Sequence, residues 1–373
     1  MQFDLTKPQK LLQESARTLF RRRCSMGRVR ELMESDSAHD PELWQEFVDQ
    51  GWTGLVFPEE VDGLDLGMVE LAALMEVMGE FCVPGPFLNH LSASVVLNEL
   101  RNHDLARARL REAIAGESRI VVALHETESR WGLNGVRLAL RREAGRITLE
   151  GSKSRVSGAV EADWILAAVR DDEELAVVLI PANQEGVTVK ATPAIDPTRP
   201  MGEIHFDGVL ITEDHVLGRG EAALGAFTRW LQVGTVMTCA DLVGGMQWVL
   251  DATVEYAKSR EQFGRPIGSH QMIQEQCADM LLWVESSRSA AYYAAWALDE
   301  GDPDTGRALS MAKAYCSDAG REVGNRGVQV HGGIGFTWEH DLHLYYKRAK
   351  ASELLYGDAT FHRELLAKLI LDE

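Results

Sequence analysis

The segment "QVHGGIGF" (residues 329–336) places two adjacent glycines in a stretch whose flanks have helical periodicity. A glycine inside a helix lowers stability by about 1 kcal/mol relative to alanine, because it has the most backbone freedom to lose on folding. Gly332 and Gly333 therefore predict either the junction of two helices or a backbone that must stay bare of side chains for a functional reason.

A second candidate for chemistry lies near the carboxyl end, where "YGDATFHR" (356–363) combines an acid with a histidine. Asp358 stands directly before the helical pattern "ATFHRELLAKLI", in the position of an N-cap whose carboxylate accepts backbone N–H bonds. Such bonds lower a carboxyl pKa, whereas a general base works best with a pKa near the working pH. We favour a capping role for Asp358 over a catalytic one, and expect His362 to be a surface or core histidine.

Composition limits the classes of function that these residues serve. The net charge of −19 provides no basic surplus for nucleic acid, although one or two local cations suffice for a phosphorylated ligand. The five cysteines are too widely spaced for a disulfide framework or a zinc site, so we expect reduced, buried thiols and no metal. The first 20 residues contain no apolar run long enough for a signal peptide or a membrane span, which predicts a cytoplasmic protein away from membranes.

The hydrophobic period changes twice along the 373 residues. Residues 7–118 follow a helical period, interrupted by a loop at 54–67; residues 119–217 follow a period of two, without the crossover helices of parallel βαβ units. The helical period returns at 222–258, 269–299, 303–328 and 359–371. We therefore predict an α+β fold with an N-terminal helical domain (1–118), a middle antiparallel β domain (119–221) and a C-terminal four-helix bundle (222–373).

This order, together with two motifs, resembles the acyl-CoA dehydrogenase family. The motifs are "YAKSREQFGRPIGSHQMIQEQCADM" (256–280) and "QVHGGIGFTWEHDLHLYYKRAK" (329–350), and weaker matches occur at 54–67 and 204–218. The resemblance spans nearly the whole chain. It implies α,β-dehydrogenation of an acyl-CoA thioester with FAD as cofactor, and an electron-transfer flavoprotein as electron acceptor.

In this family FAD lies across a subunit interface, and the resemblance assigns one half of that site to the two motifs. Arg260 would contact the pyrophosphate, since a guanidinium fork suits phosphate oxygens. Gly332 and Gly333 would let the backbone approach the dinucleotide, where a Cβ would collide. The residues assigned to this donated half are Arg260, Phe263, Gln271, Gln329, Gly332 and Gly333. For Arg260, a surface ion pair with Glu255 or Glu261 is the plainer alternative.

The half of the site that receives the flavin ring departs from the family pattern. The stretch "ALHETESRWGLNG" (123–135) keeps Glu126 but loses the proline and the glycine–serine pattern of the family's "LTEPxxGSD". In "GSKSRVSG" (151–158), Arg155 replaces an aromatic residue and Gly158 replaces an asparagine. Only Ser157 keeps a group able to bond the flavin edge.

The family places its carboxylate base at one of two positions. At the commoner one, before the final helix, this chain has Gly357, with Asp358 one residue out of register. At the other, on the first helix of the C-terminal bundle, it has Gly234, and no acid occurs between Glu221 and Asp241. If this subunit works alone, Asp358 is the remaining candidate base.

Some members of the family, including those acting on sterol side-chain thioesters, assemble as α2β2 tetramers with one complete site per heterodimer. The favoured interpretation is the partner subunit of such a pair, completing the FAD site of a neighbour that owns the base. The alternatives are a self-sufficient homo-oligomer (dimer or tetramer) using Asp358, a non-catalytic scaffold that binds acyl-CoA or flavin, and a member diverted to hydration or oxygenation.

Overall fold

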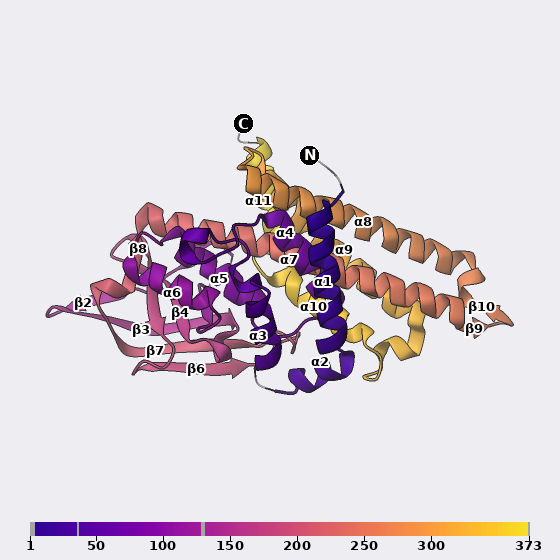
Figure 1. Cartoon of the computed structure of the whole chain (residues 1–373), viewed down its shortest axis with the longest axis horizontal. Coiled ribbons are helices and arrows are strands. Elements are labelled where there is room, and N and C mark those ends of the chain that lie inside the picture. The colour runs from indigo at the N-terminus through magenta and orange to yellow at the C-terminus, as the bar shows by residue number, and fades with distance from the viewer. Residues whose placement is uncertain (1–3, 36, 128–130, 372–373) are drawn as a thin grey trace. The chain divides into compact units, whose positions relative to one another are not determined.

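The computed structural model describes residues 4–35, 37–127 and 131–371 (Figure 1). Helices occupy the first third, as the period predicted. They are α1 (Lys7–Arg23), α2 (Met26–Met33), α3 (Pro41–Asp49), α4 (Met68–Glu80), α5 (Phe87–Glu99) and α6 (Asp104–Ile114). The expected loop at 54–67 contains only short 3₁₀ turns, at Trp52–Gly54 and Glu59–Val61.

The middle third is a sandwich of two four-stranded sheets, with orders β1-β4-β5-β8 and β2-β3-β7-β6. Its strands are β1 (Ile120–Ala123), β2 (Leu140–Glu143), β3 (Arg146–Ser157), β4 (Trp164–Asp171), β5 (Glu174–Pro181), β6 (Val187–Thr192), β7 (Met201–Ile211) and β8 (Val216–Arg219). Side chains such as Leu149, Ile204, Val169 and Val178 from both sheets form one buried core. Strands β4 and β5 form a hairpin, with turn residue Asp172 at a positive φ of 53°.

One sequence prediction about this domain is wrong: the sheets are not wholly antiparallel. β1 pairs with β4 in parallel, with Ile120 opposite Trp164 and Ala123 opposite Ala167. A parallel pair needs a long connection, and the prediction looked only for a helical one. Here the connection runs through the β2–β3 hairpin, which belongs to the other sheet.

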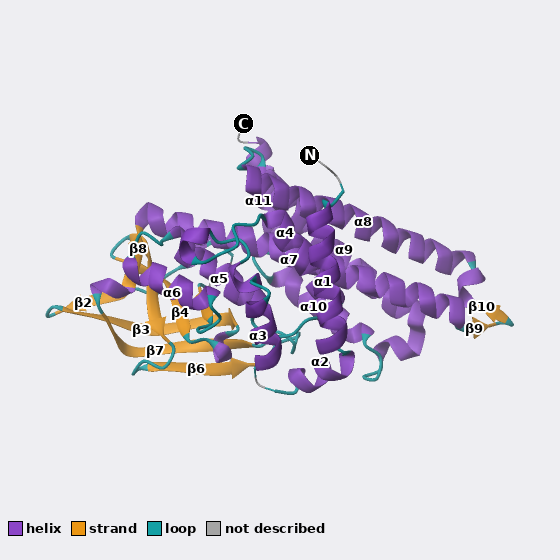
Figure 2. Cartoon of the chain, viewed as in Figure 1, coloured by secondary structure: helices purple, strands orange, loops and turns teal. Residues whose placement is uncertain are grey.

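The last third is helical again, and it holds more than four helices. They are α7 (Gly220–Ser259), α8 (Gln271–Glu300), α9 (Thr305–His331), α10 (Leu342–Leu354) and α11 (Ala359–Leu371). A hairpin of two short strands, β9 (Glu261–Gln262) and β10 (Arg265–Pro266), joins α7 to α8 (Figure 2). The sequence prediction missed α10, whose polar and apolar residues do not separate into two clear faces.

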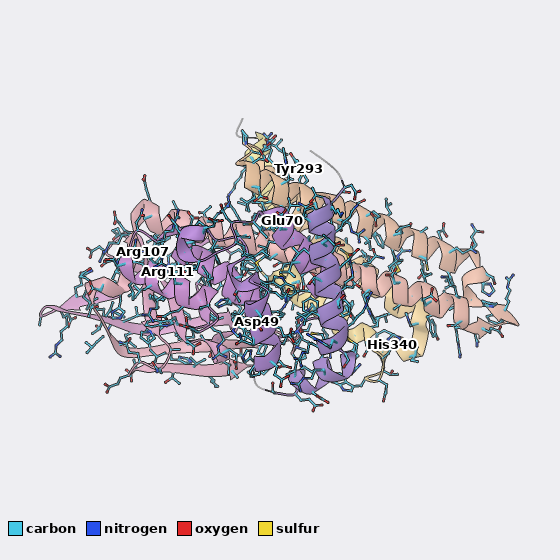
Figure 3. All side chains as sticks on the ribbon, viewed as in Figure 1. Asp49, Glu70, Arg107, Arg111, Tyr293 and His340 are labelled. Atoms are coloured by element: carbon cyan, nitrogen blue, oxygen red, sulfur yellow. The ribbon has the colours of Figure 1, made fainter. Side chains whose placement is uncertain are left out.

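The chain divides into two compact units. One contains residues up to Arg30, Gly67–Val83 and Thr235 onward; the other contains Glu31–Leu66 and Pro84–Gly234. In the first unit α4 is buried on nearly all sides, as expected for a helix that is apolar all round. The side chain of Glu70, labelled in Figure 3, accepts bonds from Gly67 N and Gln9 Nε2 and so anchors the start of α4 to α1.

Helix α7 is long and apolar enough to cross a membrane by composition alone, but 83% of its most apolar window is buried inside the protein. This is the pattern of a core helix. The five cysteines form no disulfide, as the sequence predicted; four of them are buried and Cys277 is half-buried.

Candidate functional site

Arg260 lies at the junction of α7 and the β9–β10 hairpin, where two backbone bonds fix its position. Its N–H donates to the Tyr256 carbonyl at 2.8 Å, and its own carbonyl accepts from Ile267 N at 2.8 Å. Its side chain is exposed, and the contacts between described residues include no ion pair for it. Glu255, one expected surface partner, instead binds Lys258 Nζ at 2.6 Å. The guanidinium is therefore accessible to a group outside this chain.

Phe263 occupies the tip of the hairpin in an unfavourable conformation. Its φ is +54° and that of Gly264 is +77°, the two-residue turn that normally selects asparagine or glycine first. A side chain in the left-handed region costs about 1–2 kcal/mol. The ring is also 92% exposed. Neither feature stabilises the isolated chain, which indicates a contact with another molecule.

The two glycines lie in a turn that follows α9, so they do not interrupt the helix. Gly332 has a φ of +64°, so its backbone favours glycine. Gly333 has no such φ, and a Cβ added there would meet nothing within 4 Å. No contact among the described residues therefore explains Gly333, and its bare backbone faces open space suited to a ligand that approaches closely.

Gln271 and Gln329 complete the donated half and are also exposed, at the start of α8 and in the last turn of α9. All six residues assigned to this half belong to one compact unit. An exposed guanidinium, two amides and a bare backbone match the diphosphate and polar edges of a dinucleotide. We call these six residues the donor surface. Their chemistry fits FAD.

The region expected to receive the flavin ring contains a buried ion pair that the sequence did not reveal. Lys153 on β3 is fully buried and donates to Glu126 Oε1 at 2.7 Å and to the Leu124 carbonyl at 3.1 Å. Glu126 also accepts bonds from Arg137 N and Leu138 N. Burial lowers the pKa of Lys153; for Glu126, burial is outweighed by these hydrogen bonds, so its pKa is lowered as well. Glu126 is thus a structural anchor of the segment that follows β1.

Arg155 and Ser157 follow Lys153 on the same strand. Arg155 has a positive φ of 55° and is exposed, and its Nη2 donates to the Glu126 carbonyl at 3.2 Å. Ser157 is half-buried and lies opposite Met201 of β7. Gly158 has a φ of +73° and donates its N–H to the Pro200 carbonyl. The wall that is aromatic in the family carries an arginine here.

Asp358 caps the last helix. Its Oδ1 accepts a bond from Phe361 N at 2.8 Å, the N-cap geometry that the sequence favoured. The nearby His362 is buried, and its Nε2 donates to the Tyr356 carbonyl at 2.9 Å. Burial lowers the pKa of His362 to about 4. Asp358 is engaged with backbone, and His362 is a core residue.

Gly357 has no room for a side chain. Its φ is +102°, and an added Cβ would meet Phe361 Cδ1 at 2.5 Å and His362 Nε2 at 2.9 Å. Its carbonyl accepts a bond from the buried Lys313 Nζ at 2.8 Å, which also binds the Glu353 carbonyl at 3.0 Å. Burial lowers the pKa of Lys313 to about 8. The turn at the commoner base position is therefore held closed around a glycine.

Lys313 and Lys153 hold the two segments in place through buried hydrogen bonds, and the sequence analysis did not single them out. Lys313 has a signal, because it stands in the core-facing register of a helix whose neighbours are small and apolar, "LSMAKAYCSDAG". Lys153 sits inside a strand whose pattern alternates, on the buried side. A lysine at a core position requires hydrogen-bonding or ionic partners, so its place in the pattern predicts a buried polar contact.

Comparison with known proteins agrees with this geometry. The acyl-CoA dehydrogenase N-terminal and C-terminal domain models match residues 6–117 and 224–371. The chain is 29% identical over 366 residues to the acyl-CoA dehydrogenase IpdE2 of Mycolicibacterium smegmatis, covering 98% of each chain. It resembles the crystal structure of the ChsE4–ChsE5 complex from Mycobacterium tuberculosis with a TM-score of 0.89 and 26% identity over the full length of both chains.

A variant of the Tcur3481–Tcur3483 steroid acyl-CoA dehydrogenase matches with a TM-score of 0.87 and 27% identity, covering 98% of each chain. The two domain models, the full-length relatives and the observed order of helices, sheets and helices agree with one another. The chain therefore belongs to the acyl-CoA dehydrogenase family of FAD-dependent oxidoreductases.

Proposed function

We propose that this chain is the partner subunit of a hetero-oligomeric acyl-CoA dehydrogenase, an α2β2 tetramer, in which its donor surface completes the FAD site of a neighbouring subunit. That neighbour supplies the flavin pocket and the carboxylate base. The observation that carries the proposal is the contrast within this chain. The donor surface is exposed and chemically intact, whereas both base positions hold glycine.

The base positions support this division of labour. Gly357 has a backbone conformation and neighbours that leave no space for a carboxylate side chain. Asp358 binds the backbone of α11 through Oδ1. Abstraction of a proton α to a thioester needs an acceptor within hydrogen-bond reach and of suitable pKa, and neither residue is free for that role.

The surroundings of the donor surface support a protein partner. Besides Phe263, four of the described apolar side chains close in sequence to donor-surface residues are exposed and belong to the same compact unit: Met272 (70% exposed), Phe336 (79%), Trp338 (58%) and Ile334 (45%). We call these five residues the apolar margin, because each lies within a few residues of a donor-surface residue in the sequence. Exposed aromatic residues near a functional segment are typical of an interface that a partner covers.

When bound, FAD would supply the hydride acceptor that α,β-dehydrogenation of an acyl-CoA requires. The contribution of this chain is binding and orientation. Arg260 would hold the diphosphate by paired N–H donors, Gln329 and Gln271 would bond the polar edges, and the bare Gly332–Gly333 backbone would admit the dinucleotide. Ser157 would take part only where this chain's own flavin pocket is occupied.

The relatives suggest a substrate class. The Tcur3481–Tcur3483 enzyme is described as a steroid acyl-CoA dehydrogenase, and ChsE4–ChsE5 is a complex of two proteins. We propose a coenzyme A thioester of a sterol-derived acyl chain as substrate, an electron-transfer flavoprotein as acceptor, and a cytoplasmic location.

The test is expression of the chain alone and together with a second acyl-CoA dehydrogenase subunit from the same genome that carries a glutamate at a base position, with flavin occupancy measured by visible absorbance. We expect the chain alone to be colourless, and the co-expressed pair to be yellow and to bleach with an acyl-CoA. Yellow chain alone that bleaches fully would establish a self-sufficient enzyme instead. A yellow pair that never bleaches with acyl-CoA thioesters would favour a scaffold or a different reaction.

Arg260→Ala in the co-expressed pair should lose FAD, because the diphosphate charge is left unpaired. Arg265→Ala is the matched control. It removes an exposed arginine from the same hairpin, whose Nη2 contacts His270 Nδ1 at 3.1 Å within this chain. Equal retention of FAD by both variants would refute the donor-surface assignment.

A further inference from the structure

The donor surface is built from two segments that are far apart in sequence. The first is the hairpin from Arg260 to Ile267, which carries the guanidinium; the second is the turn Gly332–Phe336, which carries the bare backbone. Among the hydrogen bonds between described residues, none joins one segment directly to the other. To hold one rigid dinucleotide, the two must nevertheless keep a fixed separation.

One aromatic contact links the two segments at their base. The ring of Tyr256, on the last turns of α7, stacks on the ring of His331, the last residue of α9, with centroids 4.5 Å apart and planes 21° apart. Tyr256 is the residue whose carbonyl receives the Arg260 N–H. His331 directly precedes Gly332. The Tyr256 ring therefore belongs to the residue whose carbonyl binds the first residue of the hairpin, and the His331 ring belongs to the residue directly before the glycine turn.

The orientation of the His331 ring is fixed on several sides. Its Nδ1–H donates to the Gly327 carbonyl at 2.8 Å, one helical turn back, and the side chain is only 4% exposed. His340 packs against it edge-on, with centroids 4.7 Å apart. Figure 3 labels His340 in the loop between α9 and α10, and its Nδ1 accepts from Leu342 N at 3.1 Å. These contacts together hold the His331 ring in one orientation.

The glycine turn closes back onto the same histidine. A Cβ added at Gly335 would lie 3.0 Å from His331 Cβ and 3.1 Å from the Val328 carbonyl, so the turn passes directly over this side chain. Thr337 N–H closes the turn with a bond to the Ile334 carbonyl. The position of Gly332–Gly333 is thus set by His331, and that of Arg260 by Tyr256.

We propose that Tyr256 and His331 are positioning residues that fix the spacing between the arginine hairpin and the glycine turn, so that the two grip the FAD diphosphate as one unit. This inference rests on the proposed function, since it assumes that the donor surface binds FAD. Neither residue needs to touch the cofactor. Their effect is to remove relative motion of the two segments before binding, which is a preorganisation that raises affinity.

The first experiment uses this chain alone and needs no cofactor. Tyr256→Leu removes one ring, and hydrogen exchange measured by mass spectrometry should then rise in residues 332–338, across the stack. His331→Gln removes the other ring, and exchange should rise in residues 260–267. Tyr256→Phe keeps the ring and should behave as the unmodified chain. Unchanged exchange in the opposite segment for both ring-removing variants would overturn the proposal.

A matched control comes from another tyrosine in the same unit. Tyr293, labelled in Figure 3, stacks on Trp296 within α8, with centroids 6.0 Å apart and planes 21° apart. Tyr293→Leu removes a comparable stacked ring far along the chain from both segments. If it raised exchange at 260–267 and 332–338 as much as Tyr256→Leu does, general loosening would be the cause and the proposal would fail.

The second experiment measures FAD release from the co-expressed pair by the recovery of flavin fluorescence. An aromatic pair contributes about 0.5–1.5 kcal/mol, so Tyr256→Leu should weaken FAD binding by about threefold to tenfold. Tyr256→Phe and Tyr293→Leu should not. Arg260→Ala separates the two hypotheses. If it keeps FAD, the proposed function fails; if it loses FAD while Tyr256→Leu binds normally, only the positioning role fails.

Discussion

At the scale of single residues, positions 357 and 358 show how a site is closed to chemistry. The carbonyl of Gly357 is bound by Lys313, its φ is +102°, and the space that a side chain would need is filled by Phe361 and His362. Asp358 directs Oδ1 to the backbone of α11. A carboxylate is present in the sequence at this point, but its hydrogen bonding commits it to the helix.

Asp358 gives a prediction in which stability and catalysis separate. Asp358→Asn keeps an N-cap acceptor, so both the stability and the turnover of the co-expressed enzyme should be unchanged. Asp358→Ala removes the acceptor and should lower the unfolding free energy by about 1 kcal/mol while turnover persists. Denaturant titration and an acyl-CoA assay measure the two effects. A loss of about 10²-fold or more in kcat for the asparagine variant would identify Asp358 as the base instead.

Gly357→Glu restores the family's acid in sequence but not in geometry. The variant must leave a left-handed backbone and displace Phe361, so we expect its unfolding free energy to fall by about 1–3 kcal/mol. The chain expressed alone should gain no acyl-CoA-dependent bleaching of added FAD. Gly333→Ala, at an open site without positive φ, is the control for a harmless substitution of glycine in the isolated chain. A Gly357→Glu chain that is stable and active alone would contradict the closed-turn interpretation.

At the scale of elements, the β9–β10 hairpin is shaped for a contact outside its own chain. Its turn accepts a phenylalanine where asparagine is favoured, and leaves the ring in solvent. The conformational preference of this turn position and the residue that occupies it, Phe263, therefore disagree. Such disagreement is expected at functional sites, where another requirement outweighs local stability.

Phe263→Asn should therefore have opposite effects on the chain and on the assembly. Asparagine tolerates the left-handed conformation, so the unfolding free energy of the chain alone should rise by about 0.5–1 kcal/mol. Thermal unfolding of the chain alone should accordingly occur at a slightly higher temperature. Retention of FAD and of the partner in the co-expressed pair should fall, as measured by size-exclusion chromatography with flavin detection. Phe263→Tyr keeps an aromatic ring and should retain both. If Phe263→Asn strengthened assembly, the result would show that the hairpin is not part of the interface.

The elements also show what sequence reasoning reaches. The changes of period near residues 119 and 222 correspond to the start of β1 at Ile120 and of α7 at Gly220, because each period reflects a buried face. The direction of β1 relative to β4 was out of reach, since it depends on which sheet the β2–β3 hairpin joins. Helix α10 was missed because packing on its neighbours stabilises it more than its own pattern does.

The candidate site was predictable to a similar, partial extent. Arg260, Gln329 and the glycine pair stand in contiguous motifs, so sequence alone could nominate them as candidates. The Glu126–Lys153 pair and the Lys313 bonds join residues 27 or more positions apart, and no local pattern reports such contacts. The left-handed φ of Gly357 likewise depends on the packing of α11.

At the scale of the whole molecule, three buried or half-buried histidines predict acid sensitivity. Burial lowers the pKa of His90, His125 and His362 to about 4 in the folded chain, from an ordinary value near 6.5. The unfolded state therefore binds more protons below pH 6.5, so stability is lost as pH falls from about 6.5 to about 4.

The check is urea unfolding of the chain at pH 7.5, 6.0 and 5.0, where the unfolding free energy should decrease steadily. His362→Gln removes one of the three groups and should flatten the decrease, even if it lowers stability at pH 7.5. A pH profile identical in slope to that of the unmodified chain would show that folding does not lower the pKa of His362.

The apolar margin around the donor surface has a consequence for how the protein must be made. A polypeptide that exposes Phe263, Phe336 and Trp338 to water is prone to self-association until a partner covers these side chains. In the proposed pair, balanced synthesis of the two subunits would then matter as much as their affinity, and we expect surplus copies of this chain in the insoluble fraction.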